Sequence, residues 1–176
     1  MLFRSAFLYR IHRAERKAWW FSSDGSGRFD LTSSKSLGTC YLAEDPLGSF
    51  VEVFRDTRLS AEEDVFARRL SALRLRKRMK LADCTSRKTR AWGLTAAIHS
   101  GEDYELTQAW ARAFHAAGFD GVRYFVSHDP SQRLVGVALF GRAGAPSWST
   151  GRSARIGPAL IREAERRFGL RVVPVP

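Results

Sequence analysis

Residues 104–141 read YELTQAWARAFHAAGFDGVRYFVSHDPSQRLVGVALFG, and this stretch decides the fold. Apolar residues recur at helical spacing from Tyr104 to Ala117, and Gly118 stands where a left-handed C-terminal cap would lie. Two β-rich segments follow, FDGVRYFVSH and RLVGVALFG, separated by the turn signal Asp129-Pro130. A helix followed by two consecutive strands predicts a single compact domain of the α+β class.

The N-terminal part of the chain predicts further strands. Residues 6–12 (AFLYRIH) and 39–43 (TCYLA) are apolar and rich in β-formers. Between them, the Gly- and Ser-rich stretch SSDGSGRFDLTSSKSLG at 22–38 predicts a loop, which carries Arg28. The next segment, GSFVEVFRD at 48–56, contains Glu52 and fits either a strand or a helix.

Two patterns define the middle of the chain. Ser60-Ala-Glu-Glu63 has the form of a capping box, which predicts a helix over roughly 60–70. In residues 73–80, Leu and Met alternate with Arg and Lys at the two-residue period of a half-exposed strand, broken only by Lys77. This row of cations could contact nucleic-acid phosphates. No recognised nucleic-acid module or aromatic platform accompanies it, so we favour a solvated edge-strand face.

The last part of the chain predicts a linker and a helix. Residues 142–157 are rich in Gly, Ser and Ala. PALIREAERRF at 158–168 starts with Pro at a first helical position and has apolar residues on one side. We therefore assign residues 1–141 to the main domain, and residues 142–176 to a linker and a C-terminal helix that packs on that domain.

Composition bounds the class of protein. A chain of 176 residues with 44% hydrophobic content can enclose one substantial core. Its formal charge of +11, from 29 Lys and Arg against 18 Asp and Glu, favours polyanionic partners. The two cysteines and four histidines have no metal-ligand spacing, so no metal site is predicted. Arg4 and Arg10 interrupt the apolar N-terminus, which argues against a signal peptide or membrane span and predicts a cytoplasmic protein.

Glu52 is the most informative polar residue. It lies among Phe50, Val51, Val53 and Phe54, where a carboxylate is costly unless it is paired or functional. An outward-facing Glu on an amphipathic strand explains the same pattern equally well. These neighbours alone leave both interpretations open.

The order of several motifs resembles the RES-domain family, bacterial proteins named for an Arg, a Glu and a Ser. The matching motifs run through residues 9–141: Tyr9-Arg10, Gly27-Arg28-Phe29, Gly38–Ala43 with Tyr41, Glu52, and Gly118–Ser127. The intervals between Arg28, Glu52 and Ser127 agree with the layout of the family. Asp30 departs from it, since Asn is common after the aromatic residue, and so does Gly48 before the Glu.

The resemblance implies a fold similar to that of ADP-ribosyltransferase toxins, with a cleft that holds NAD. Several family members are toxins of toxin–antitoxin pairs that degrade NAD by hydrolysis or phosphorolysis, restrained by a helix-turn-helix antitoxin. It therefore makes residues 1–141 an NAD-binding catalytic domain, with NAD as the substrate and no cofactor. It also implies an antitoxin partner, is compatible with a homo-oligomer, and gives nucleic acid at most an indirect part.

Carried over by the resemblance, Arg28, Glu52 and Ser127 are the expected catalytic set, and Arg10 and Tyr41 are expected to bind substrate with them. Glu52 would stabilise positive charge on the ribose or hold its 2′-hydroxyl. Arg28, together with Arg10, would hold the diphosphate. Tyr41 would border the nicotinamide ribose, and Ser127 would donate its hydroxyl to ribose or phosphate.

Two other classes of function remain open at this point. A basic binding module for nucleic acid or an acidic protein, without catalysis, would also explain the charge of +11. An ADP-ribosyltransferase would bind NAD in the same way and differ only in passing ADP-ribose to a macromolecule. The residues do not choose between water, phosphate and a macromolecule as the acceptor.

Overall fold

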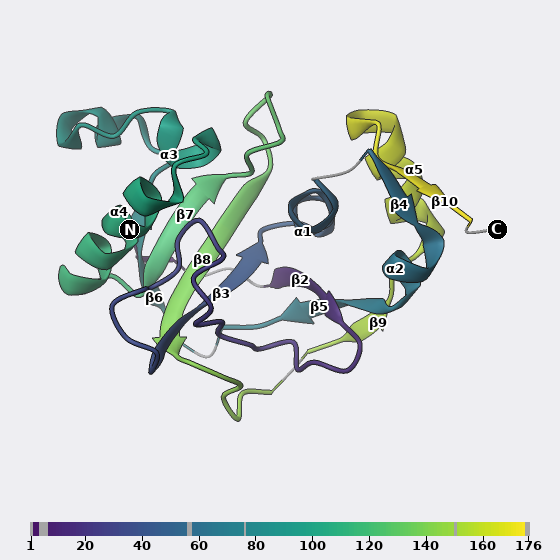
Figure 1. Cartoon of the computed structure of the whole chain (residues 1–176), viewed down its shortest axis with the longest axis horizontal. Helices are drawn as coiled ribbons and strands as arrows, with labels where there is room; N and C mark the ends of the chain where they lie inside the picture. Colours follow the sequence, from purple (N-terminus) through teal and green to yellow (C-terminus); the bar gives the residue numbers. More distant parts are fainter. Residues whose placement is uncertain (1, 4–6, 56–57, 76, 150, 175–176) are drawn as a thin grey trace.

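An eight-stranded mixed sheet forms the centre of the molecule, in the strand order β1-β6-β7-β8-β3-β2-β5-β9. The computed structural model describes residues 2–3, 7–55, 58–75, 77–149 and 151–174 (Figure 1). The strands of this sheet are β1 (Leu2–Phe3), β2 (Leu8–Arg13), β3 (Leu37–Ala43), β5 (Arg68–Leu73), β6 (Met79–Asp83), β7 (Gly121–Phe125), β8 (Val135–Arg142) and β9 (Ser153–Arg155). A separate parallel pair joins β4 (Leu59–Ala61) to β10 (Arg171–Val173).

Helices surround this sheet, which confirms the predicted α+β class. They are α1 (Pro46–Phe54), α2 (Glu62–Phe66), α3 (Ala97–Ser100), α4 (Tyr104–Ala116), α5 (Pro158–Phe168) and the 3-10 helix η1 (Arg87–Trp92). Only one residue pair, Tyr9 with Ala43, connects β2 to β3. The sheet therefore divides into two halves that run in different directions, and α1 lies in the angle between them (Figure 1).

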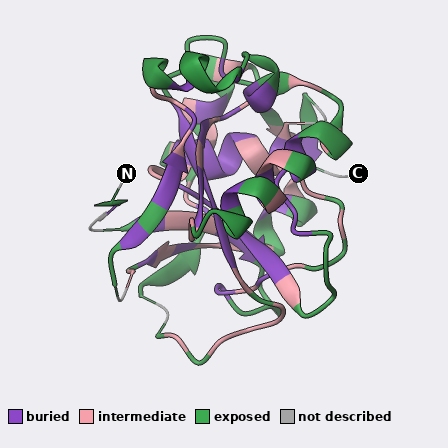
Figure 2. Ribbon diagram, turned by 90° about the vertical axis from the view of Figure 1, so that its left-hand side faces the viewer, coloured by how far each residue is buried: buried purple, intermediate pink, exposed green. Residues whose placement is uncertain are grey.

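Each face of the sheet is covered by its own apolar cluster, and buried residues concentrate on the sheet and on the helix faces turned toward it (Figure 2). On one face, Phe114 of α4 packs with Phe29 and Val122. On the other, Trp19 and Phe21 pack with residues of β3, β6 and β8. A third cluster joins α1 to α5 through Phe50, Ala164 and their neighbours, which fixes α1 from behind.

Most of the elements predicted from sequence are confirmed. The segment 6–12 overlaps β2, which ends one residue later, although Ala6 lies outside the described residues, and TCYLA lies in β3. The helix from Tyr104 is α4, and Gly118 follows it with a left-handed φ of +76°. The two strands after it are β7 and β8, and α5 begins with Pro158 in its first turn.

In the segment GSFVEVFRD, left open between strand and helix, residues 48–54 belong to helix α1, and Asp56 lies outside the described residues. The side chain of Asp45 caps this helix by accepting a hydrogen bond from the Gly48 amide at 2.9 Å, and Pro46 occupies the first turn. Phe50 and Phe54 are both buried on the same side, at the four-residue spacing of a helix. The residues that mark the start of the helix, Asp45 and Pro46, thus lie just before the segment whose structure was left open.

The capping box predicted at Ser60 is wrong. Ser60 is buried in strand β4, where it pairs with Val172 of β10, and the short helix α2 starts after Ala61 without a side-chain cap. Residues 68–73, placed partly in that helix, form strand β5. The N-cap position is taken by Ala61, so Ser60, which pairs with β10, lies one residue too early to cap the helix.

The single basic strand predicted at 73–80 is also wrong. Strand β5 ends at Leu73 and β6 begins at Met79, so most of the cations lie on the connection between two strands. Arg74, Lys77 and Arg78 are exposed to solvent, whereas Arg76 lies outside the described residues. The alternation of apolar and basic residues in the sequence therefore continues by chance through the connection between β5 and β6.

The segment 142–176 takes part in the main sheet and core. Strand β9, within the predicted linker, pairs with β5, and β10 pairs with β4. Helix α5 packs on α1. Among the described helices, none is long and apolar enough to cross a membrane.

Candidate active site

Helix α1 carries Glu52 to the floor of a cleft. The carboxylate is largely buried, with 18% of its side chain exposed, and its Oε2 accepts a hydrogen bond from Arg55 Nη1 at 2.7 Å. Within the described part of the chain, the buried Oε1 makes no hydrogen bond of normal geometry. Because an unsatisfied buried carboxylate oxygen is costly, Oε1 is the obvious acceptor for a hydroxyl of a bound molecule.

Arg55 links Glu52 to helix α4. Its Nη2 donates to the Tyr104 hydroxyl at 3.1 Å, while its Nη1 holds the Glu52 carboxylate. Residues 52 and 55 lie three apart on or just after α1, so both side chains point from the same side of the helix. Arg55 therefore fixes the direction of the carboxylate.

Arg28 reaches the same cleft from the loop between β2 and β3. It is 8% exposed, and its Nη1 donates to the Gly101 carbonyl. Its guanidinium carbon lies 5.0 Å from the centre of the Tyr104 ring, in the geometry of a cation–π contact. The described chain supplies an acceptor only for Nη1, which leaves the other donors available to an anion.

Tyr41 of β3 fixes the loop that presents Arg28. Its hydroxyl donates to Asp30 Oδ1 at 2.7 Å and accepts from the Phe29 amide at 2.9 Å. Asp30 Oδ2 in turn accepts from the Gly27 amide at 2.9 Å. A Cβ at Gly27 would clash with both the Tyr41 ring and Asp30, which explains the glycine before Arg28.

Helix α4 holds the same loop from the other side. Gln108 is buried and its Nε2 donates to the Gly25 carbonyl at 2.9 Å and to the Gly27 carbonyl at 3.0 Å. The backbone on either side of Ser26 is thus tied to a helix, and the backbone leading into Arg28 is rigidly placed.

Two adjoining cavities meet at Glu52. The larger, of about 280 Å³, is lined by Arg28, Glu52, Tyr41, Arg55 and Tyr124, with Asp30 and the loop beside them. The smaller, of about 140 Å³, is lined by Arg10, Tyr41, Glu52 and Tyr124 among others. The fold therefore brings four of the five predicted site residues to one cleft, namely Arg10, Arg28, Tyr41 and Glu52.

Burial and charge act in opposite directions on Glu52. Burial raises the pKa of its carboxyl above the ordinary value, while the cations Arg55 and Arg28 and the Tyr124 hydroxyl lower it. Burial also raises the pKa of Tyr124 well above that of a free tyrosine, and the Glu52 charge adds to this effect. Tyr124 is therefore a neutral hydroxyl beside the carboxylate at any physiological pH.

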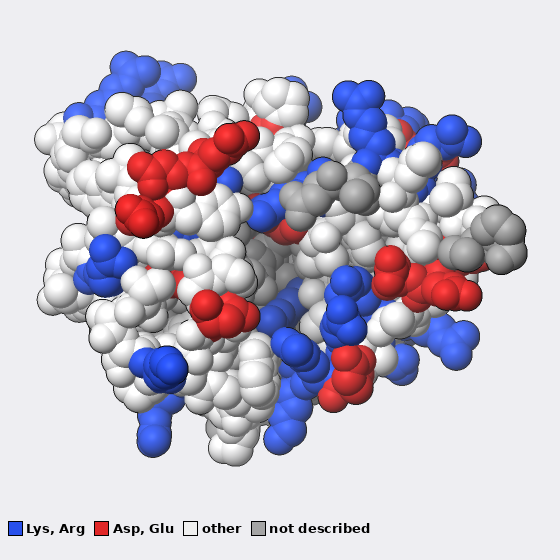
Figure 3. All heavy atoms as spheres, in the orientation of Figure 1, with Lys and Arg blue, Asp and Glu red and all other residues white. Residues whose placement is uncertain are grey.

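Side chains of both charges line the cleft, with Arg28 and Arg55 beside Asp24, Asp30 and Glu52. Figure 3 shows Lys and Arg side chains spread over this face of the molecule, with acidic side chains in fewer groups. Burial, together with the nearby Arg28 charge, lowers the pKa of His99 to about 4, so this ring is neutral at pH 7. The fixed positive charge near the cleft therefore comes from arginine side chains.

Arg10 has a structural role that the sequence did not suggest. Its Nη1 donates to the carbonyls of Ala18 at 2.8 Å and Trp20 at 2.9 Å, and contacts Cys40 Sγ at 3.2 Å. One end of the guanidinium is thus occupied by the segment that leads into the Arg28 loop. Its place in the smaller cavity still leaves it within reach of a ligand there.

Ser127 is the predicted site residue that the structure places elsewhere. It lies in the turn after β7, and its Oγ is 3.0 Å from His128 Nδ1. The described residues that line the two cavities at Glu52 do not include Ser127. Its predicted role toward ribose or phosphate stays a prediction.

Sequence reasoning did not single out Tyr124, Arg55 or Tyr104. A signal for Tyr124 existed, because it shares the buried parity of Val122 and Val126, where a phenol needs a polar partner. Arg55 would have been noticed only once Glu52 was placed on a helix. Tyr104 comes from a distant helix and carried no local signal. Among the described residues, no group of His, Cys, Asp and Glu is arranged to hold a metal ion.

Comparison with known proteins agrees with this architecture. The family model described as "RES domain" matches residues 7–156. A chain of the M. tuberculosis MbcT–MbcA toxin–antitoxin complex superposes with a TM-score of 0.68 at 21% sequence identity, covering 93% of this chain and 90% of that one. No curated protein sequence matches significantly. At this level of identity, the structural likeness speaks for the fold.

Proposed function

The chain belongs to the RES-domain family, and from that premise we propose that it is an enzyme that cleaves the nicotinamide–ribose bond of NAD. The observation that carries the proposal is the buried Glu52 carboxylate, held by Arg55 through one oxygen and left with the other unpaired in a cleft shared with Arg28. We propose in addition that the fold is similar to that of ADP-ribosyltransferase toxins.

The chemistry of the cleft suits this reaction. Cleavage of the bond leaves a neutral nicotinamide and develops positive charge on the ribose, as in glycoside hydrolysis. The Glu52 carboxylate stabilises that charge, and Oε1 accepts a hydrogen bond from a ribose hydroxyl. Because the leaving group is neutral, the reaction needs no strong general acid, and the groups beside Glu52 include the neutral phenols Tyr41 and Tyr124.

Arginines account for the phosphates of the substrate. Arg28 keeps donors free in the cleft and its planar guanidinium matches phosphate oxygens in bidentate fashion. Arg10 assists from the smaller cavity, with one nitrogen already bonded to the backbone of Ala18 and Trp20. Ser127 donates to the end of the substrate that projects toward the turn after β7.

The similar solved structure supports the biological setting that we propose. The similar M. tuberculosis chain comes from a toxin–antitoxin complex, which supports a toxin role for this chain and an antitoxin as its partner. A protein that depletes NAD in its own cell acts in the cytoplasm and must be restrained there. We assign the helix-turn-helix antitoxin of the family as that partner.

The decisive experiment measures release of nicotinamide from NAD by the purified protein, with and without phosphate. Glu52→Gln should lower the rate at least about 100-fold, because it removes the charge and keeps the shape. Glu63→Gln, at an exposed position of α2, is the matched control and should change nothing. Absence of nicotinamide release under both conditions, or a change below about threefold in Glu52→Gln, contradicts the proposal.

The fate of the ADP-ribose separates the open acceptors. With NAD labelled in the adenine part, free ADP-ribose indicates hydrolysis, a phosphorylated product that needs phosphate indicates phosphorolysis, and label retained on a macromolecule indicates transfer. Each outcome leaves the cleavage step at Glu52 the same.

A further inference from the structure

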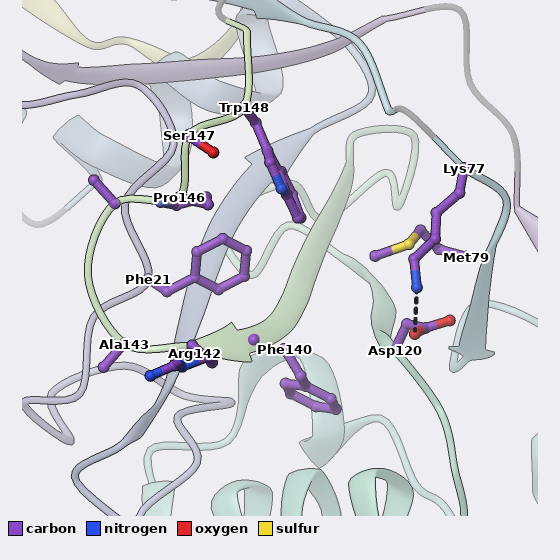
Figure 4. Close-up of a pocket in the computed structure, with 12 residues that line it drawn as sticks. Phe21, Lys77, Met79, Asp120, Phe140, Arg142, Ala143, Pro146, Ser147 and Trp148 are labelled. Carbon is purple, nitrogen blue, oxygen red and sulfur yellow. Dashed lines mark ion pairs between the residues drawn. The ribbon is translucent and has the colours of Figure 1, made fainter.

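A third cavity, of about 520 Å³, lies apart from the Glu52 cleft (Figure 4). It forms where the end of β8 and the following segment approach the start of β6, and its lining shares no residue with the two cavities at Glu52. Its volume falls within the range of small-molecule sites, roughly 300–1,000 Å³. The cavity is therefore large enough to be a site of its own.

The two sites lie on opposite faces of the sheet. Tyr41 packs with the cluster under α4, whereas its strand neighbours Cys40 and Leu42 pack with the cluster that includes Trp148. Successive residues of a strand point to opposite faces. A molecule bound beside Trp148 would thus be separated from Glu52 by the sheet itself.

Aromatic side chains form the walls of this cavity and are held in place. The Trp148 ring lies edge-on to Trp19, with centroids 5.0 Å apart, and to Phe21, with centroids 5.7 Å apart. Trp148 projects into the space between Phe21 and Met79, whereas the ring of Phe140 points away from Trp148 and packs in the cluster under α4 (Figure 4). Trp148 stays partly exposed although it is anchored on one edge. A fixed, partly exposed tryptophan ring favours a flat apolar ligand.

The charges on the rim are mainly positive. Arg142 is exposed and has no ion-pair partner in the described chain. Lys77 reaches Asp120 only at 4.0 Å, and the other oxygen of Asp120 already accepts from the Lys80 amide at 2.7 Å. The rim thus carries two cations and one carboxylate, a net positive charge that favours a ligand with a single anionic group.

The apolar lining continues beyond Lys77. A smaller cavity of about 240 Å³ shares Lys77, Met79 and Trp148 with the first and adds Leu75. Lys77 therefore borders both cavities, where it can meet an anionic group while Trp148 contacts the body of a ligand.

We propose that this cavity binds a small molecule with a flat apolar body and one anionic group, of the aromatic carboxylate or sulfonate class. Trp148 and the edge of Phe21 contact the body, and Lys77 and Arg142 attract the anion. The site stands independently of NAD cleavage.

The fluorescent sulfonate 8-anilinonaphthalene-1-sulfonate is a direct probe for the full-length protein. We expect saturable binding of one molecule. The pair of substitutions Lys77→Gln and Arg142→Gln should weaken binding of the sulfonate at least fivefold and leave the neutral analogue 1-anilinonaphthalene unchanged, because only the charge is lost. Both residues are exposed, so the fold should not be affected. Arg155→Gln with Arg162→Gln removes the same charge at exposed positions outside this cavity, and should have no effect on either dye.

A second variant tests the aromatic wall. Trp148→Ala should weaken both dyes about tenfold, whereas Trp92→Ala, which removes an exposed tryptophan of η1, should not. Thermal unfolding shows whether Trp148→Ala is folded. If it is not, the variants of Lys77 and Arg142 test the proposed site. Binding that is unsaturable, that is equally weakened by the control pair, or that is insensitive to folded Trp148→Ala overturns the proposal. Nicotinamide release is not used, so either proposal can fail alone.

Discussion

Arg55 holds the Glu52 carboxylate by one oxygen at 2.7 Å, while the second oxygen, Oε1, is buried and has no hydrogen bond of normal geometry in the described chain. The two oxygens therefore have different tasks. Oε2 fixes the orientation of the group, and Oε1 is left for a ligand. This asymmetry places Arg55 as a positioning residue for the proposed reaction.

Replacing Arg55 should change the pH dependence of NAD cleavage. Arg55 lowers the pKa of Glu52 against the raising effect of burial, so Arg55→Gln lets that pKa rise further. If the reaction needs the carboxylate, activity is lost as the pH falls through the pKa of Glu52. The acidic limb of the pH–rate profile should then move to higher pH, on the order of one pH unit.

Arg58→Gln is the matched control, because Arg58 is exposed shortly after the same helix. It should leave the profile in place. An unchanged acidic limb in Arg55→Gln, together with a lower rate at every pH, would argue that Arg55 does not act through the charge of Glu52.

Tyr41→Phe should destabilise the protein. It leaves Asp30 Oδ1 without its donor at 2.7 Å and the Phe29 amide without its acceptor at 2.9 Å. An unmade hydrogen bond of a buried group costs about 1–3 kcal/mol, to be measured by urea unfolding. Tyr9→Phe is the control, since the Tyr9 hydroxyl has no partner within the described residues. Equal stabilities of the two variants would show that the hydrogen bonds of the Tyr41 hydroxyl to Asp30 and Phe29 do not stabilise the protein.

Gly27→Ala should disturb the loop that carries Arg28. The added Cβ would clash with the Tyr41 ring and Asp30, and overpacking of this kind typically costs about 1–3 kcal/mol. We expect lower thermal stability and slower nicotinamide release. Gly157→Ala has no atom within 4 Å of the new Cβ and should cost less than about 1 kcal/mol, through the weaker N-cap of α5. A fully active, stable Gly27→Ala would show that the loop adjusts freely.

Asp129 should make stability depend on pH. Burial raises the pKa of this carboxyl, but hydrogen bonds from Ser131, Leu134 and Arg133 together lower it below the ordinary value. Its stabilisation is therefore complete above the unfolded pKa of about 3.9 and is lost as the pH falls through the folded value. Asp129→Asn should cost about 1–3 kcal/mol at pH 7 and much less at pH 3, by urea unfolding.

Asp64→Asn provides the comparison for Asp129, because Asp64 is an exposed helix residue. Its effect should stay within about 0.5 kcal/mol at both pH values. A cost for Asp129→Asn that is the same at pH 3 as at pH 7 would assign the effect to shape and not to charge.

The fold could be predicted from sequence where the signals were local. Helix α4 with Gly118 after it, and strands β7 and β8, follow from periodicity and turn residues alone. The errors at Ser60 and at 73–80 share another cause. In both places the structure depends on a partner strand far along the chain, and neither a capping pattern nor a period of two contains that partner.

The candidate site was predicted in part because its order along the chain resembles a family. Arg28, Tyr41 and Glu52 do meet in one cleft, and Arg10 borders the adjoining cavity. Arg55 and Tyr124 were missed because their meaning depends on α1 being a helix and on β7 facing the cleft. The sequence could not predict where the Ser127 hydroxyl points, because that direction depends on the path of the turn after β7.

The packing of α1 against α5 has a consequence for protein synthesis. The helix that carries Glu52 emerges from the ribosome long before Ala164 of α5, which packs in the same cluster, and before β10, which pairs with β4 just beyond α1. A nascent chain ending before residue 158 lacks that support. The site around Glu52 therefore becomes complete only once these later segments have been translated.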